Sequence, residues 1–277
     1  MSLFERQMGH VGRYRLISSD NPWAHDNYGQ AKHGSAKANY DEMPLEDMCR
    51  MPVRELAHPA GALLFLWCTG PQAADGAHVE LANAWGFTLT TRVFAWVKHG
   101  TTCAGCGHLH DEHDAPALWG ADAGGRCRID LNGDPADPCP CSHFAVSADF
   151  GPGSYTGGNV EDVWLGVRGD TPWSKLRARR DVRQVLFAPA PARHSEKPEA
   201  MQDRIEALWP NVDPTERLEL FARRRRPGWA CWGGQCPEPD LVFGEAVGAW
   251  WPVTKPAARP EPAALFTPEQ LARAEGA

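Results

Sequence analysis

The 277-residue sequence lacks a hydrophobic run long enough to cross a membrane. Its longest apolar stretch, residues 60–68, has the length of a buried strand, whereas a spanning helix needs about 20 apolar residues. A signal-peptide pattern is also missing, since no basic segment followed by an apolar one opens the chain. We therefore expect a cytoplasmic protein without a membrane partner.

The sequence also lacks the features of an exported disulfide framework and of a strongly basic protein. The nine cysteines are an odd number, so metal binding or buried thiols explain them better than disulfides. A net charge of −7 argues against indiscriminate binding to nucleic acid. Two arginine clusters, residues 177–180 and 223–226, offer a local basic face, and a solvated surface is the alternative for each.

What is present fits one main domain. With 43% hydrophobic and 23% charged residues, the chain has the composition of a globular protein and enough length for one sizeable core. Short apolar runs alternate with amphipathic segments, which predicts an α/β fold with a largely parallel sheet. Strands are predicted at residues 14–18, 62–68, 89–98, 160–167, 182–187 and 217–222. Helices are predicted at residues 44–48, 72–85 and 197–209.

Two segments break this rhythm. Residues 99–149 form a cysteine- and histidine-rich insert, and residues 252–277 form a Pro/Ala-rich tail that is more like a linker than a core element. The main domain is therefore predicted to span residues 1–251, interrupted by the insert.

The insert has the residues of a structural zinc site. It contains a C-x2-C pair, a C-x-C pair, one cysteine between them and several histidines. Zinc prefers four thiolate or imidazole ligands in a tetrahedron, and two close pairs separated by a loop can supply them. The predicted ligands are Cys103, Cys106, Cys139 and Cys141, with Cys127 and His113 in reserve. A binuclear arrangement and unligated thiols are the alternatives, and a catalytic zinc is not expected because no H-E-x-x-H motif occurs.

Several sequence blocks occur in an order that resembles a known family. The blocks are SSDNPW at residues 18–23, GSAKANYDEMPLEDMCRMPV at 34–53, LLFLWCT at 63–69, RVFAWVK at 92–98, GPGSYTGGNVEDVWLGVRG at 151–169, RHSEKPEAMQDRIEALWP at 193–210 and LELFARRRRPGWACWGGQ at 218–235. Together they resemble the MT-A70 family of adenine amino-methyltransferases, which act on messenger RNA in eukaryotes and on DNA in bacteria and phages. The resemblance covers most of residues 13–235.

This resemblance implies a Rossmann-like methyltransferase fold that binds S-adenosylmethionine, with the catalytic motif at residues 20–23. The lone pair of adenine's amino nitrogen is delocalised into the ring, so acceptors must hold its hydrogens during transfer. The carboxylate of Asp20 and the backbone carbonyl of Asn21 would accept them, Pro22 would hold the turn, and Trp23 would stack on an extruded base. Asn21 replaces a proline of the family motif, which frees the turn. A plain turn with a core tryptophan is the alternative.

The resemblance also carries over four cofactor-binding residues: Lys197, Glu219, Arg223 and Gln235. Each has a chemical task, because ammonium and guanidinium groups pair with a carboxylate and an amide binds ribose hydroxyls. Surface salt bridges are the alternative for each. Gly234 stands where the family usually has asparagine, so one ligand contact is missing here.

The implied function is methylation of the exocyclic 6-amino group of adenine, with DNA preferred over RNA as the partner. An RNA adenine methyltransferase is one alternative. A catalytically inactive, zinc-bearing nucleic-acid-binding subunit is another, and Asp20 and Trp23 argue against it because such a subunit needs neither. The insert is expected to position nucleic acid or to stabilise a neighbouring loop.

Overall fold

The computed structural model describes residues 9–23, 42–109, 113, 127–129, 138–142, 158–190 and 196–241. The chain divides into two compact units. The first comprises residues 1–92, 163–177 and 210–277, and the second comprises residues 93–162 and 178–209. The predicted insert therefore falls within the second unit, while the predicted tail at residues 252–277 lies outside the described residues.

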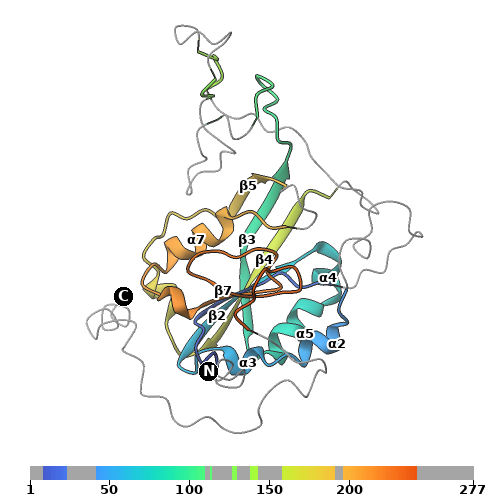
Figure 1. The fold of residues 1–277 in the computed structure, drawn as a ribbon, viewed down its shortest axis with the longest axis vertical. Coiled ribbons are helices and arrows are strands. Elements are labelled where there is room, and N and C mark those ends of the chain that lie inside the picture. The colour runs from blue at the N-terminus through green and yellow to red at the C-terminus, as the bar shows by residue number, and fades with distance from the viewer. Residues whose placement is uncertain are drawn as a thin grey trace, which may run out of the picture. The chain divides into compact units, whose positions relative to one another are not determined.

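The strands form a sheet in the order β5-β3-β4-β2-β1-β6-β7 (Figure 1). Parallel pairing joins β1 to β2, β1 to β6, β6 to β7 and β3 to β5. The strands are β1 Leu16–Ser19, β2 Gly61–Cys68, β3 Thr88–His99, β4 Val160–Gly169, β5 Val185–Pro189, β6 Arg217–Leu220 and β7 Ala230–Trp232. All six predicted strands are confirmed with shifted ends, and β7 is an additional strand. The α/β class is confirmed, and the sheet is consistent with a methyltransferase fold.

The helices differ from the sequence prediction by one break and by two additional short helices, α3 Val53–Leu56 and α6 Trp173–Leu176. The others are α2 Leu45–Cys49, α4 Gly70–Asp75, α5 Ala77–Ala84 and α7 Ala200–Leu208. The single helix predicted at residues 72–85 is two helices, because Gly76 has a φ of 82° in the left-handed region and ends α4. Among the described residues, no helix is long and apolar enough to cross a bilayer.

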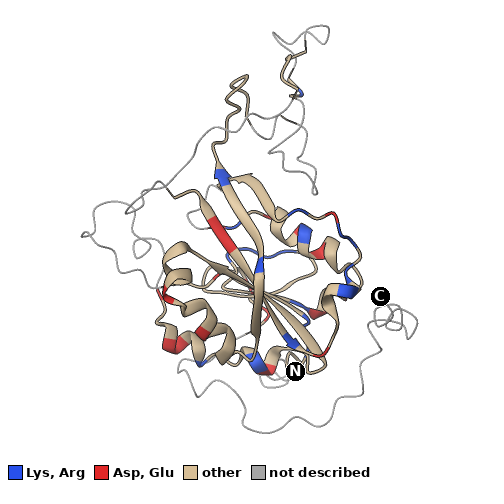
Figure 2. Cartoon of the chain, turned by 180° about the vertical axis from the view of Figure 1, so that it is seen from behind, with Lys and Arg blue, Asp and Glu red and all other residues tan. Residues whose placement is uncertain are grey.

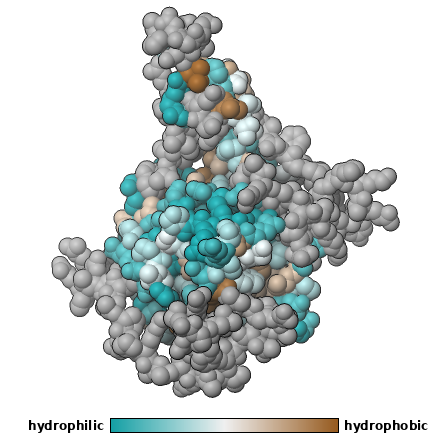
Figure 3. All heavy atoms as spheres, in the orientation of Figure 1, coloured by the Kyte–Doolittle hydropathy of each residue, from teal (hydrophilic) through white to brown (hydrophobic). Residues whose placement is uncertain are grey.

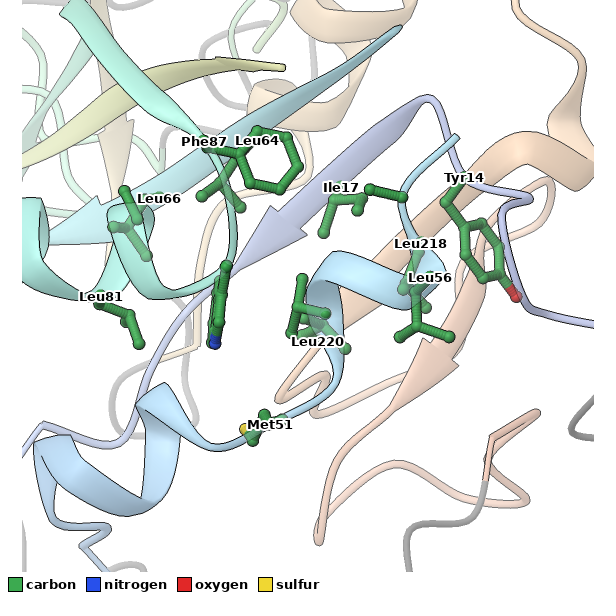
Figure 4. Packing of buried hydrophobic residues seen from close by; sticks show 14 of the residues in the cluster. Tyr14, Ile17, Met51, Leu56, Leu64, Leu66, Leu81, Phe87, Leu218 and Leu220 are labelled. Carbon is green, nitrogen blue, oxygen red and sulfur yellow. The ribbon is translucent and has the colours of Figure 1, made fainter. Parts of the chain in front are cut away.

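The core of the first unit lies between the strands and the helices α2, α3 and α5. Every residue of β2 is buried, as expected of a strand covered on both faces. Figure 4 shows Leu81 of α5 and Phe87 beside Leu64 and Leu66 of β2, all within one buried cluster. Burying a leucine or phenylalanine side chain stabilises a fold by about 1.5–3 kcal/mol. This cluster therefore fixes the central strands, whose ends carry the motif at residues 20–23.

In the second unit, α7 is tied to β5 by a buried arginine. Arg204 Nη1 donates to the carbonyl oxygens of Arg183 at 2.6 Å and Val185 at 2.7 Å. Burial lowers the pKa of the Arg204 guanidinium to about 10. The indole Nε1 of Trp96 on β3 donates to the Ala188 carbonyl of β5 at 2.9 Å. These bonds fix the chain from which Lys197 projects, three residues before α7.

Candidate functional site

The predicted catalytic motif directly follows β1, a strand that lies between β2 and β6. Ser19, the last residue of β1, is in register with Leu66 of β2 and Leu220 of β6. Because these strands are parallel, their carboxyl ends meet at one edge of the sheet, and such edges are where open α/β sheets bind ligands. Asp20 follows β1 at this edge.

The side chain of Asn21 fixes the turn that the missing proline would have held. Asn21 is only 4% exposed. Its Oδ1 accepts a hydrogen bond from Ser19 Oγ at 2.8 Å, and its Nδ2 donates to Met48 Sδ at 3.2 Å. Two side-chain bonds thus hold the residue in place, so the turn keeps a defined conformation without a proline at this position.

The backbone of the turn is also paired. The Trp23 amide donates to the Asn21 carbonyl at 2.9 Å, and the Met43 amide donates to the Pro22 carbonyl at 2.9 Å. A carbonyl oxygen has two lone pairs, so one intramolecular bond leaves Asn21 O able to accept another hydrogen.

Trp23 lies in the core cluster and is 4% exposed. Its indole Nε1 donates to the Trp67 carbonyl at 3.2 Å. This is the packing arrangement of the alternative interpretation, and a stacking role for Trp23 stays a prediction. Four other tryptophans, at positions 67, 85, 96 and 164, lie in predicted core elements and are expected to be packing residues; the first three are buried, and Trp164 is partly exposed.

Two of the four predicted cofactor residues contact each other. Arg223, three residues after β6, donates from Nη1 to Oε1 of Gln235, three residues after β7, at 3.1 Å. β6 and β7 are parallel neighbours, so both residues follow carboxyl strand ends. Glu219 lies within β6, half-buried and in register with Ser18 of β1.

The backbone before Arg223 adopts a rare conformation. Phe221 has a φ of 58°, a value that costs a non-glycine residue about 1–3 kcal/mol. Its ring packs edge-on against Trp232 at 5.0 Å, and the amide of Ala222 donates to the Trp232 carbonyl at 2.8 Å. A Cβ on Gly233 would lie 2.3 Å from the Ala222 carbonyl oxygen, so only glycine fits there. The two loops are therefore held close together at the strand ends.

Lys197 lies in the second unit, in a buried ion cluster that sequence reasoning missed. Its Nζ lies 3.0 Å from Glu161 Oε2, and Lys98 Nζ lies 2.6 Å from Glu161 Oε1. Burial alone would raise the pKa of Glu161, but the two ammonium groups outweigh it and hold that pKa at about 2. The Lys197 side chain is 10% exposed, so its ion pair is buried rather than superficial. The available signal was the acidic pair Glu161 and Asp162 near the start of the predicted strand at residues 160–167.

The predicted zinc ligands gather in the second unit in two groups of four. The first group is Cys103, Cys106, His113 and Cys141, and the second is Cys106, His108, Cys127 and Cys139. Within each group the ligand atoms all lie within 4.8 Å of one another. All six residues that the sequence predicted are therefore brought together, and His108 joins them. The C-x2-C-x-H spacing of residues 103–108 was the signal for this histidine.

Burial raises the pKa of the Cys106 thiol to about 12, with the thiols of Cys103, Cys141 and Cys139 adding to the rise. None of the nine cysteines forms a disulfide. A cation bound among these thiols would replace their protons and stabilise the thiolates, which is the chemistry of a metal site.

The two arginine clusters are partly paired with acids. Arg179 lies 2.7 Å from Asp181, and Arg225 contacts both carboxylate oxygens of Asp240 at 3.0 and 3.1 Å. Figure 2 shows basic and acidic residues interspersed along the described helices and strands. The coloured residues on the face in Figure 3 are mostly hydrophilic. These contacts agree with the solvated-surface alternative for Arg179 and Arg225.

An α/β sheet with polar residues at the carboxyl ends of its parallel strands defines the class of open α/β proteins that bind their ligands at this edge. A family model described as MT-A70 matches residues 14–113 and 145–235, which is more than half of the chain. The protein belongs to the MT-A70 family of methyltransferases. The chain is also similar to the type II methyltransferase M.MunI of Mycoplasma sp, with 26% identity over 245 residues, covering 83% of this chain and 80% of that protein.

Proposed function

We propose that the protein transfers a methyl group from S-adenosylmethionine to the exocyclic 6-amino group of adenine in DNA. The observation that carries the proposal is the placement of Asp20 directly after the central strand β1, in a turn anchored by the side chain of Asn21. This supports an intact catalytic motif, because the position that departs from the family pattern has gained hydrogen bonds that compensate for the missing proline.

Asp20 and Asn21 supply the acceptors that the reaction needs. The amino nitrogen becomes nucleophilic when its two hydrogens are held and its lone pair turns out of conjugation. In the proposed reaction the Asp20 carboxylate accepts one hydrogen and the Asn21 carbonyl accepts the other, while Pro22 completes the turn. Trp23 supports the extruded base by stacking.

The donor set fits S-adenosylmethionine, which supplies the methyl group. The guanidinium of Arg223 and the amide of Gln235 match a carboxylate and ribose hydroxyls, and their mutual hydrogen bond orients both. Glu219 offers a carboxylate for the ligand's ammonium group. Lys197 offers a second cation, oriented by its ion pair with Glu161.

Two further assignments belong to the proposal. The similarity to a type II methyltransferase favours DNA over RNA as the substrate. The cysteine-rich insert is proposed to bind structural zinc, because its thiolate and imidazole groups are the ligands that zinc prefers.

The test is a transfer assay with separate substrates. Purified full-length protein is incubated with isotopically labelled S-adenosylmethionine and either DNA or RNA, and the products are digested to nucleosides. Label in N6-methyladenine from DNA, absent with Asp20→Asn, supports the proposal. Label from RNA alone would instead assign the RNA alternative. No transfer to either, with S-adenosylhomocysteine still bound, would indicate the inactive subunit.

A further inference from the structure

We propose that the cysteine-rich insert binds two zinc ions that share the thiolate of Cys106. The two ligand groups, each with three cysteines and one histidine, have this one residue in common. His113 belongs to the first group only, and His108 belongs to the second only. A single-ion site has no use for two complete ligand sets built around one cysteine.

The distances within the groups match tetrahedral coordination. Bonds of 2.3 Å to sulfur and 2.0–2.1 Å to nitrogen place ligand atoms about 3.8 Å apart for two sulfurs and about 3.6 Å apart for sulfur and nitrogen. Cys103 Sγ lies 3.7 Å from Cys141 Sγ, and Cys106 Sγ lies 3.5 Å from His113 Nε2. In the second group, His108 Nδ1 lies 3.2 Å from Cys127 Sγ. These spacings surround a tetrahedral ion without large movement of the side chains.

The number of ligands also fits. Two tetrahedra that share one corner require seven ligands, and the two groups together contain seven residues: Cys103, Cys106, His108, His113, Cys127, Cys139 and Cys141. A thiolate has enough lone pairs to bridge two cations. Both shells would then be complete, with no position open for water, so the ions would be structural.

The backbone around the ligands is held by its own hydrogen bonds. The amide of Gly107 donates to the Cys103 carbonyl at 2.8 Å, and the amide of Cys103 donates to the His108 carbonyl at 2.8 Å. Gly107 has a φ of 77°, which lets the chain turn back between Cys106 and His108. One turn therefore presents ligands to both ions.

The other ligands come from paired extended segments. The amide of Cys127 donates to the Cys141 carbonyl at 3.1 Å, and the amide of Cys139 donates to the Ile129 carbonyl at 2.9 Å. An isolated bridge also joins His113 to Cys127. Cys127 and Cys141 lie in different groups, so the segments connect the two sites. Two ions would crosslink four short segments of the insert.

The first experiment is a count of metal on the wild-type protein. Full-length protein purified without chelator is analysed by native mass spectrometry and plasma emission, and we expect two zinc ions per chain. A value of one or none after reconstitution with excess zinc would overturn the proposal. The readout does not involve methyl transfer, so its failure is distinct from failure of the proposed function.

Single substitutions then assign each ion. His113→Ala and His108→Ala should each reduce the count from two to one, while Cys106→Ala should weaken both ions. Cys49→Ala is the matched control, because Cys49 lies in α2 outside both groups and should leave two ions bound. Two tightly bound ions in Cys106→Ala would contradict the shared thiolate.

The shared thiolate can also be tested without any substitution. Reconstitution of the wild-type protein with cadmium-113 should give two NMR resonances with a scalar coupling between them, because a common sulfur links the nuclei. Two uncoupled resonances would contradict the bridge. This measurement decides the question even where a variant fails to fold.

Discussion

Arg223 Nη1 donates a hydrogen bond to Gln235 Oε1 at 3.1 Å, joining the loops that follow β6 and β7. The contact depends on backbone features of both loops. Phe221 takes a left-handed φ just before Arg223, and Gly233 lies against the Ala222 backbone just before Gln235. The two side chains are therefore oriented in advance, which lowers the entropy cost of binding a ligand.

Removal of either partner should weaken cofactor binding by different amounts. Gln235→Ala should raise the Kd for S-adenosylhomocysteine about 2- to 12-fold, as for one neutral hydrogen bond. Arg223→Ala should raise it about 10- to 150-fold, because a charged hydrogen bond is lost. Calorimetry on the full chain measures both. Arg179→Ala is the control, because Arg179 is an exposed arginine in the other unit, and this variant should bind the ligand like wild type. Equal affinities for all three variants would contradict the assignment of Arg223 and Gln235 to the cofactor site.

Asp20→Asn should separate chemistry from binding. The amide keeps the shape of the side chain but removes the charged acceptor, so turnover should fall at least about 100-fold. The affinity for S-adenosylhomocysteine should stay near wild type, because Asp20 is assigned to the target amine. Single-turnover transfer and calorimetry check the two values. Near-normal turnover would show that the motif is not catalytic.

Much of this fold was predictable because a continuous apolar run in the sequence indicates a buried strand. Residues 61–68 are such a run, and all eight residues of β2 are buried. β7 was not predicted because it is only three residues long, which is too short to distinguish a strand from a loop. The helix break at Gly76 was not predicted, because an isolated glycine within an amphipathic segment is compatible with a continuous helix.

The site was predictable only to the level of residue identities. The contacts of those residues are made with segments far apart in the chain. Glu161 pairs with both Lys197 and Lys98, and Asn21 donates a hydrogen bond to Met48. Sequence spacing carries no signal for such pairs. The candidate metal ligands were easier to predict, because close cysteine pairs are recognisable in the sequence. Their division into two groups could be seen only in the fold.

Substitutions of Trp23 can distinguish a role in core packing from a role in stacking on the extruded base. Its buried ring and its bond to the Trp67 carbonyl predict that Trp23→Ala destabilises the fold by about 3–5 kcal/mol. Trp23→Phe keeps an aromatic face but loses the Nε1 donor. If the ring also stacks on the extruded base, this variant should retain most of its activity at temperatures where it stays folded. Urea unfolding and transfer assays are compared for both variants; a folded Trp23→Ala protein with wild-type KM for DNA would exclude stacking.

Glu161 should make stability depend on pH in the acidic range. Its folded pKa of about 2 lies below the value of 4.5 for a free glutamate, so its stabilising effect is complete above pH 4.5 and is lost as pH falls toward 2. Between pH 7 and pH 3 this group should cost wild type about 2 kcal/mol of unfolding free energy. Urea unfolding of wild type and Glu161→Gln at both pH values measures it.

At pH 7, Glu161→Gln should lose about 3–5 kcal/mol of unfolding free energy, because it leaves the largely buried Lys197 and the partly buried Lys98 without their counterion. The difference in unfolding free energy between wild type and Glu161→Gln should be smaller at pH 3. Asp181→Asn is the matched control, since its ion pair with Arg179 is exposed and should affect stability little at either pH. If the difference in unfolding free energy between wild type and Glu161→Gln is the same at pH 7 and pH 3, Lys98 and Lys197 do not lower the pKa of Glu161.

Gly234→Asn tests the prediction that this chain lacks one ligand contact, because the resemblance to the family implies an asparagine at this position. A Cβ on Gly234 would meet no atom within 4 Å, so a side chain fits without strain. An added hydrogen bond contributes about 0.5–1.5 kcal/mol, so the Kd for S-adenosylhomocysteine should fall about 2- to 12-fold. Gly233→Ala is the matched contrast, because its Cβ would lie 2.3 Å from the Ala222 carbonyl oxygen and must displace the loop that carries Gln235. It should bind the ligand more weakly than wild type. An unchanged Kd for a stably folded Gly234→Asn protein would place the ligand away from the β7 loop.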